Sequence, residues 1–406
     1  MRTHHATREQ HRARAATIYL HLATATAVLV LMEPQFIPRS ATLVIGMVVA
    51  TVGALRFGMR SRALLWVFPS AMLATALWSS SPGFTALSST AIIIPVVLAG
   101  VVVAISEPDR FMRALAVWVR VGLVVSFALF FLRPDLGAQF DGLYDGAMRG
   151  LFAHKNGLAR LLIVGVFAEL FTRQKQSSRI FWLASLLFAA YFTRSASFFV
   201  LVGVIIFGAA YLLLITSRKK ATAAAAIGFT PLLVVLIGAV AFIYGDDLVE
   251  ESGRFSGEGD RGRIWLGVVT LWRMRHVEGW GFGQVFRPDT EAGHILYSVV
   301  GWVPTAGHSG YMNALAEGGY IGITAMLLTL ASAIAITWRN RHILIWPFIW
   351  AVALTLNNIT DTRISSVEWF LLAVGVLYVS RKQDDHVLRA RKQSLRGRTE
   401  RGVTVQ

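Results

Sequence analysis

The sequence predicts an all-α integral membrane protein with about 12 transmembrane helices and a long, partly helical outer loop between spans 9 and 10. Hydrophobic residues make up 55% of the chain, against roughly 45–50% in soluble globular proteins. Charged residues make up 15%, against about 25% in soluble domains. Apolar runs close to the length that crosses a bilayer, about 20 residues, follow one another along most of the chain.

The apolar runs divide the chain into a basic N-terminus (1–15), spans 1 to 9 (16–244), an outer loop (245–308), spans 10 to 12 (309–380) and a basic tail (381–406). The first run lacks a small-residue cleavage site, so we expect it to remain as a span. We expect the tail to be disordered near the inner leaflet. The expected spans are 16–32, 40–56, 63–79, 85–106, 113–132, 157–171, 180–193, 196–216, 222–244, 309–337, 343–360 and 367–380.

Basic residues predict the orientation of these spans. Short cytoplasmic connections of membrane proteins are enriched in Lys and Arg. Alternate connections of this chain carry such residues, namely Arg56, Arg60, Arg62, Arg110, Arg113, Arg173, Lys175, Arg179, Arg218, Lys219, Lys220, Arg339 and Arg341. Both termini are therefore expected in the cytoplasm. The net charge of +16 then reflects topology and anionic lipid headgroups instead of nucleic acid.

Two outer segments are longer than ordinary connections. They run from Arg133 to Asn156 and from about Gly245 to His308, and loops above roughly 15 residues are usually functional or disordered. Within the second, Arg263–Val277 is expected to form an amphipathic helix with Trp265 and Trp272 on its apolar side. A helix lying on the bilayer surface is the alternative interpretation.

Four clusters of polar residues fall on the outer side. They are Gly150–Arg160, Thr193–Ser197, Gly259–Trp265 and His308–Gly319. Charges at the membrane edge are costly and often functional. The residues of interest in these clusters are His154, Lys155, Asn156, Arg160, Arg194, Arg263, His308, Ser309, Tyr311 and Glu317.

The residue types in these clusters suit chemistry on a diphosphate. An arginine stays charged and binds phosphate oxygens through two parallel hydrogen bonds. A histidine takes up a proton near neutral pH. The alternatives remain open: Arg160 and Arg194 snorkel to headgroups, His308 only begins a helix, and Glu317 forms a structural salt bridge. Arg120, inside the span 113–132, does not fit an outer cluster.

Other motifs favour structural interpretations. The segment from Gly279 to Gly283 follows a helix instead of a strand, so a close turn is favoured over a dinucleotide loop. His4 and His5 lie in an N-terminal segment expected to be disordered, where we expect no metal site. The acidic cluster Asp246, Asp247, Glu250 and Glu251 is expected to be a solvated start of the outer loop, although a divalent metal is an alternative. With no cysteine in the chain, disulfides and thiolate chemistry are excluded.

At the four clusters the sequence resembles the bacterial O-antigen ligase family, which includes O-antigen ligases, O-antigen polymerases, and exopolysaccharide and teichuronic-acid biosynthesis proteins. The last cluster is similar to the family's His-Asn-x-Tyr-Leu pattern, with Ser309 where Asn is usual and Met312 where Leu is usual. The resemblance is carried by Gly150–Arg160, Arg194–Ser197, Arg263–Phe286 and His308–Gly322.

The resemblance implies a GT-C-like glycosyltransferase that uses a polyprenyl-diphosphate-linked glycan as donor, without metal or other cofactor. Arg160, Arg194 and Arg263 would contact the donor diphosphate. His308 would act as the base or orient the acceptor, so His308 and Arg263 would be the catalytic residues. The supporting residues would be His154, Lys155, Asn156, Ser309, Tyr311 and Glu317.

We therefore expect a membrane enzyme of cell-surface polysaccharide biosynthesis in the bacterial plasma (inner) membrane. Its partners would be the glycan donor, a glycan or lipid acceptor, membrane lipids and other polysaccharide-assembly proteins, and not nucleic acid. Ligase and polymerase activities both remain open, because they share the donor chemistry. The alternatives from other classes are a transporter or flippase of a charged lipid or solute, and an inactive scaffold of a polysaccharide complex.

Overall fold

The computed structural model describes residues 2–30, 32, 34–140, 145–195, 198, 202–203, 205, 208, 261–304, 306–360 and 367–400. Before residue 208 the described helices are α1 (Arg2–Ala25), α2 (Arg39–Phe57), α3 (Leu64–Ala74), α4 (Pro82–Ile105), α5 (Pro108–Leu132), α6 (Pro134–Gly137), α7 (Lys155–Phe171) and α8 (Gln176–Thr193). After residue 260 they are α11 (Arg261–Met274), α12 (Glu291–Val300), α13 (Gly310–Arg339), α14 (Trp346–Thr360) and α15 (Val367–Glu400).

Short elements complete these helices. The π-helical turn η1 (Thr26–Val30) continues α1, and the 3-10 turn η2 (Thr75–Leu77) continues α3. Strands β1 (Ala138–Gln139) and β2 (Ala147–Met148) pair antiparallel, with Ala138 opposite Met148. This small hairpin lies between α6 and α7 in the sequence.

The chain is a helical membrane protein. Five described helices are long and apolar enough to cross a membrane, at Glu9–Val30, Arg39–Phe57, Pro82–Ile105, Pro108–Leu132 and Gly310–Arg339. Helices α7, α8 and α14 coincide with expected spans at their ends to within a few residues, whereas α15 begins with the expected span 367–380 and continues to Glu400. The expected spans 196–216 and 222–244 fall largely or wholly outside the described residues, so the total of 12 stays a prediction.

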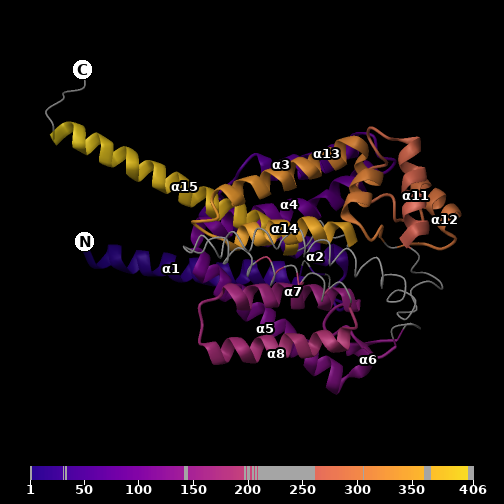
Figure 1. Cartoon of the computed structure of the whole chain (residues 1–406), viewed down its shortest axis with the longest axis horizontal. Coiled ribbons are helices and arrows are strands. Elements are labelled where there is room, and N and C mark those ends of the chain that lie inside the picture. Colours follow the sequence, from indigo (N-terminus) through magenta and orange to yellow (C-terminus); the bar gives the residue numbers. More distant parts are fainter. Residues whose placement is uncertain are drawn as a thin grey trace, which may run out of the picture.

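The terminal helices and the α11–α12 segment lie at opposite ends of the bundle (Figure 1). At the end from which α1 and α15 project, Arg62 binds Asp384 at 2.8 Å and Arg381 binds Glu107 at 2.6 Å. At the other end, the Trp78 indole donates to the Glu278 carbonyl at 2.9 Å. Polar contacts therefore hold helices together at both ends of the bundle.

The core of the bundle is built around α4 and the first half of α15. Between Val367 and Val379 every residue of α15 is buried, and α4 packs along it. Aromatic rings fill the space beside them: the Phe111 ring lies 5.8 Å from Phe370 and the Phe167 ring 4.6 Å from Trp350. Such continuous apolar burial fits helices surrounded by other helices.

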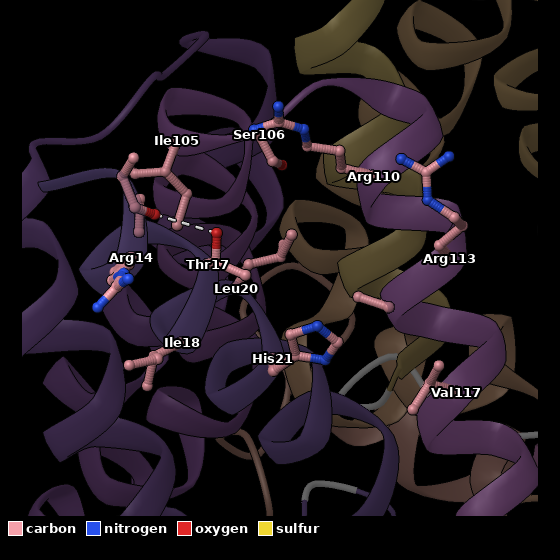
Figure 2. Close-up of a pocket in the computed structure, with 13 residues that line it drawn as sticks. Arg14, Thr17, Ile18, Leu20, His21, Ile105, Ser106, Arg110, Arg113 and Val117 are labelled. Atoms are coloured by element: carbon pink, nitrogen blue, oxygen red, sulfur yellow. Dashed lines mark hydrogen bonds between the residues drawn. The ribbon is translucent and has the colours of Figure 1, made fainter. Parts of the chain in front are cut away.

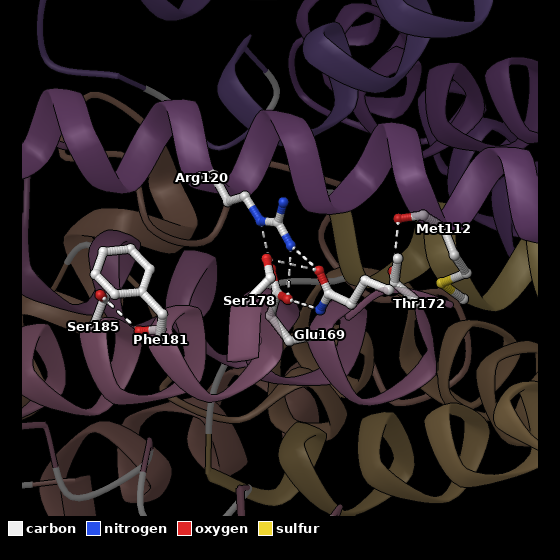
Figure 3. Close-up of polar contacts among 8 residues, drawn as sticks. Met112, Arg120, Glu169, Thr172, Ser178, Phe181 and Ser185 are labelled. Carbon is white, nitrogen blue, oxygen red and sulfur yellow. Dashed lines mark hydrogen bonds and ion pairs between the residues drawn. The ribbon is translucent and has the colours of Figure 1, made fainter. Parts of the chain in front are cut away.

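Arg120, the arginine inside a predicted span, has a structural partner (Figure 3). Its Nε donates to the Glu169 carboxylate of α7 at 2.8 Å, and its guanidinium lies 5.0 Å from the Trp182 ring. Gln174 hydrogen-bonds to both partners of this pair. An intramembrane charge is usually paired in this way, so Arg120 joins α5 to α7 and is not part of the outer clusters.

The expectation of disordered ends was wrong for the described residues. Helix α1 begins at Arg2 and α15 continues to Glu400. Residues 381–396 contain neither Gly nor Pro and are rich in Arg, Lys, Gln and Leu, which favour helix. The ion pair between Arg62 and Asp384 also ties the start of this extension to the bundle.

Candidate functional site

Helices α11 and α12 form a small outer layer with its own apolar core. Ile264, Val268 and Leu271 are buried on one side of α11, against Leu296 and Val300 of α12. The predicted amphipathic helix is therefore confirmed. Its apolar side packs on protein and not on a bilayer, which corrects the alternative of a surface-lying helix.

Helix α13 is broken at Gly319, where φ is 57° and ψ is −149°. Residues 276–283 lie beside the break. They form hydrogen bonds with backbone N–H and C=O groups of α13 that have no partner within the helix. Trp280 N donates to Ala316 O at 3.1 Å, and Gly281 N donates to Glu317 O at 2.8 Å. From the other side, Tyr320 N donates to His276 O at 2.8 Å. The prediction of a close turn at Gly279–Gly283 is confirmed.

Glu317 is held by this turn. The residue is 4% exposed, and its carboxylate accepts a hydrogen bond from Gly283 N at 3.0 Å. The alternative left open from the sequence was a structural salt bridge of Glu317. The hydrogen-bond donor found here is a backbone amide instead of a basic side chain. A carboxylate bound by backbone N–H fixes the position of the turn relative to α13.

The junction of α3 and α4 holds the turn from the opposite side. Phe282 N donates to the Thr75 hydroxyl at 2.9 Å, and the Gln284 amide donates to the Thr85 hydroxyl at 3.0 Å. Residues 276–284 are thus clamped between two parts of the chain that are far apart in sequence. We call these residues the clamped turn.

Beyond the clamped turn, Arg287 anchors the loop that leads to α12. Its guanidinium lies 3.9 Å from the centre of the Phe84 ring and donates to the Asp289 carboxylate. This hydrogen bond lowers the pKa of Asp289 below its ordinary value. The charge of Arg287 is therefore engaged in positioning the loop.

His308 lies at the mouth of α13 in a left-handed backbone conformation, with φ of 48°. The next residue, Ser309, caps the helix: its hydroxyl accepts from Met312 N at 3.4 Å and donates to Asn358 O at 3.1 Å. Tyr311 donates to Thr355 O at 2.8 Å. Ser309 and Tyr311 thus fix the start of α13 to α14, and His308 directly precedes this fixed point.

The first two sequence clusters meet at the start of α7. The His154 Nδ1 accepts from Asn156 N at 3.1 Å and caps the helix. Lys155 is 3% exposed, and its ammonium donates to Arg194 O at 3.3 Å. Lys155 N also donates to the Gln139 side chain at 3.1 Å. Gln139 was not anticipated, because its contact depends on the β1–β2 hairpin folding back onto α7.

Arg194 ends α8 in the left-handed conformation, with φ of 49°. Its guanidinium donates to Asp145 O at 3.5 Å. Arg194 and His308 are the two residues other than glycine with positive φ in the described part of the chain. This conformation costs an L-residue about 1–2 kcal/mol, and such residues cluster at functional sites.

Arg160 lies one turn deeper in α7. The residue is 2% exposed, and its Nε lies 3.9 Å from a carboxylate oxygen of Glu368 in the first turn of α15. This ion pair is longer than a hydrogen bond. Glu368 was missed in the sequence analysis, although a carboxylate at the start of the span 367–380 is an available signal.

Arg263 lies on the exposed side of α11, next to the buried Ile264. The structure thus joins Lys155 to Arg194 and Arg160 to Glu368, and places His308 directly before Ser309, which binds α14. The convergence of Arg160, Arg194, Arg263 and His308 on one cavity stays a prediction. The acidic cluster Asp246, Asp247, Glu250 and Glu251 lies outside the described residues. Among the described residues, no three His, Asp or Glu side chains form a group that would hold a metal ion.

No protein-family model and no curated protein matches the chain. The resemblance to O-antigen ligases therefore depends on the four sequence clusters alone.

Proposed function

We propose that the protein transfers a polyprenyl-diphosphate-linked glycan to an acceptor hydroxyl at the outer face of the bacterial plasma membrane, in cell-surface polysaccharide biosynthesis. The observation that carries the proposal is the pair of left-handed residues, Arg194 and His308. Both were chosen from the sequence for their chemistry, independently of their backbone. A fold that keeps two strained non-glycine residues at candidate site positions favours a functional reason for them.

The arrangement of the bundle supports an outer location of this site. Helices α1 and α15 project from one end of the bundle, and the layer of α11 and α12 lies at the other (Figure 1). Trp265 of α11 donates to the carbonyl oxygen of Gly307, the residue before His308, at 2.9 Å. Under the positive-inside rule the end with the termini is cytoplasmic. The candidate site would then face outward, where lipid-linked glycans are assembled into surface polymers.

The proposed reaction is a displacement at the anomeric carbon of the donor sugar. The acceptor oxygen forms a bond to this carbon while the bond from the carbon to the diphosphate oxygen breaks. His308 takes the proton of the acceptor hydroxyl. The polyprenyl diphosphate leaves with the bonding electron pair, and Arg160, Arg194 and Arg263 stabilise its charge. The buried Lys155 holds the backbone of Arg194 in place.

The test uses purified full-length protein, a polyprenyl-diphosphate-linked oligosaccharide and candidate acceptors, with mass spectrometry of products. Removing a general base lowers rates by roughly 10²–10⁴-fold, so we expect at least about a hundredfold loss for His308→Ala. Arg263→Ala should also lose activity. His294→Ala and Arg273→Ala, at exposed positions of the same outer layer, are the matched controls. Full activity of both site variants would refute the proposal.

A transporter or flippase is the second candidate. The broken helix α13 and the buried Glu317 favour it, since discontinuous helices with buried charges mark many transport sites. The clamped turn, however, already pairs with the break and with the carboxylate of Glu317. Substrate movement without product formation by reconstituted protein would favour the transporter over the transferase.

A further inference from the structure

A basic cavity (Figure 2) is lined by Ser106 and Arg110. It therefore lies next to the ion pair of Glu107 and Arg381, at the end of the bundle from which α1 and α15 project (Figure 1). It has a volume of about 960 Å³, which is within the range of small-molecule sites, roughly 300–1,000 Å³. Residues 13–21 of α1, the end of α4 and the start of α5 line it. Three different helices therefore shape the cavity.

The charged groups of the cavity have one sign. Arg14, Arg110 and Arg113 line it together with His21, and no carboxylate does. The two carboxylates at the start of α5 bind other arginines: Glu107 binds Arg381, and Asp109 binds Arg173 at 3.3 Å. None of these three lining arginines forms an ion pair with a carboxylate in the described part of the chain.

The rest of the lining is apolar and continues along the spans. Ile18 and Val117 are 69% and 41% exposed, and Leu20 and Ala114 lie behind them. Figure 2 shows Arg110, Arg113 and Val117 along α5 and Arg14, Ile18 and His21 along α1. The cavity thus combines phosphate-binding groups with a surface of the kind that acyl chains contact.

We infer that this cavity binds the headgroup of an anionic glycerophospholipid from the leaflet on the side of the two termini. The phosphodiester would contact Arg110 and Arg113, and Arg14 would contact it from the α1 side. Arginine suits this role because it stays charged and offers paired donors to phosphate oxygens. The first methylene groups of the acyl chains would lie along Ile18 and Val117. This inference is independent of the proposed transferase activity.

The test is lipid binding to full-length protein in detergent, measured by native mass spectrometry with phosphatidylglycerol and with phosphatidylcholine of the same acyl chains. Wild-type protein should prefer phosphatidylglycerol. An arginine that donates directly to the phosphate contributes enough that losing two such contacts predicts at least about 30-fold weaker binding. We expect this loss for Arg110→Gln with Arg113→Gln. The control, Arg56→Gln with Arg60→Gln, removes equal charge at exposed positions outside the cavity. It should change binding less than about threefold, because exposed charges that do not contact the lipid are screened by salt.

A second double variant, Arg14→Gln with Arg113→Gln, tests the cavity if the first fails to fold. Soluble glycerol phosphate should not displace the lipid, because it lacks the acyl chains. Three results would overturn the inference: no preference for phosphatidylglycerol, equal losses in the cavity and control variants, or displacement by glycerol phosphate at equal concentration. The last would identify a site for free phosphate compounds.

Discussion

Variants of the ion pair between Arg160 and Glu368 distinguish two roles of Arg160, stabilising the fold and binding the donor. The two side chains are 3% and 5% exposed, and their charged atoms lie 3.9 Å apart. With an effective dielectric constant of about 20, Coulomb's law gives an attraction of roughly 4 kcal/mol at this distance. Glu368→Gln removes this attraction from a buried guanidinium, so we expect a loss of stability of about 3–5 kcal/mol.

The double variant Arg160→Met with Glu368→Leu removes both charges and keeps similar volumes. Replacing a buried pair by apolar residues is often neutral or stabilising, so its stability should return to within about 1 kcal/mol of wild type. Denaturant titration in micelles, followed by tryptophan fluorescence, measures both effects. If the double variant is as unstable as Glu368→Gln, the loss does not come from the uncompensated charge of Arg160, and the reasoning is refuted.

Glycan transfer by the same double variant tests the second role of Arg160. If the arginine binds the donor diphosphate, the stable double variant is inactive, because it no longer provides the charge. If it transfers glycan at the wild-type rate, Arg160 acts in the fold alone and its assignment to the donor site is wrong. The conservative Arg160→Lys variant should keep partial activity, since a lysine retains the charge without the paired donors.

The remaining predictions concern backbone conformations at the outer end. His308→Gly should be more stable than His308→Ala by about 1 kcal/mol, because only glycine adopts the left-handed conformation without strain, while both variants lose glycan transfer. Equal stabilities would show that residue 308 is unstrained. Gly319→Ala would place a Cβ against the carbonyl oxygen of Val277 and should cost about 2–4 kcal/mol in thermal unfolding. The control Gly301→Ala, at a φ of 91° with open space, should cost only about 1 kcal/mol.

The positions of the helices could be predicted because apolar runs mark them in the sequence. Helix α2 covers Arg39–Phe57 and the expected span was 40–56. Helix α12 (Glu291–Val300) was missed because it is short and its apolar side faces α11 instead of lipid. The extension of α15 to Glu400 was missed because its charge suggested disorder, whereas its helix-forming residues continue the last span.

The sequence located several residues of the candidate site but not their partners. Lys155 and Arg194 were both selected, and the structure brings them together. Glu368, the partner of Arg160, and Glu169, the partner of Arg120, lie far away in the sequence. Local patterns do not encode such pairings, because they depend on which helices are neighbours. The Gly318–Gly319 pair in the sequence could have indicated a break in α13. The hydrogen bonds that stabilise the break depend on residues 276–283, which lie elsewhere in the sequence.

The clamped turn also has a consequence for the biosynthesis of the protein. Its hydrogen bonds to Trp78 and Thr75 join positions 200 and 207 residues apart, and its other bonds require Ala316 and Tyr320. When the ribosome has made the chain only as far as residue 300, the clamped turn can form its bonds to Thr75, Trp78 and Thr85 but not those to α13. The bonds to Ala316 and Tyr320 can form only once α13 has been made, so this end of the molecule is completed only after α13 has inserted. A nascent or truncated chain that ends before α13 should therefore expose the outer layer to proteases and quality control.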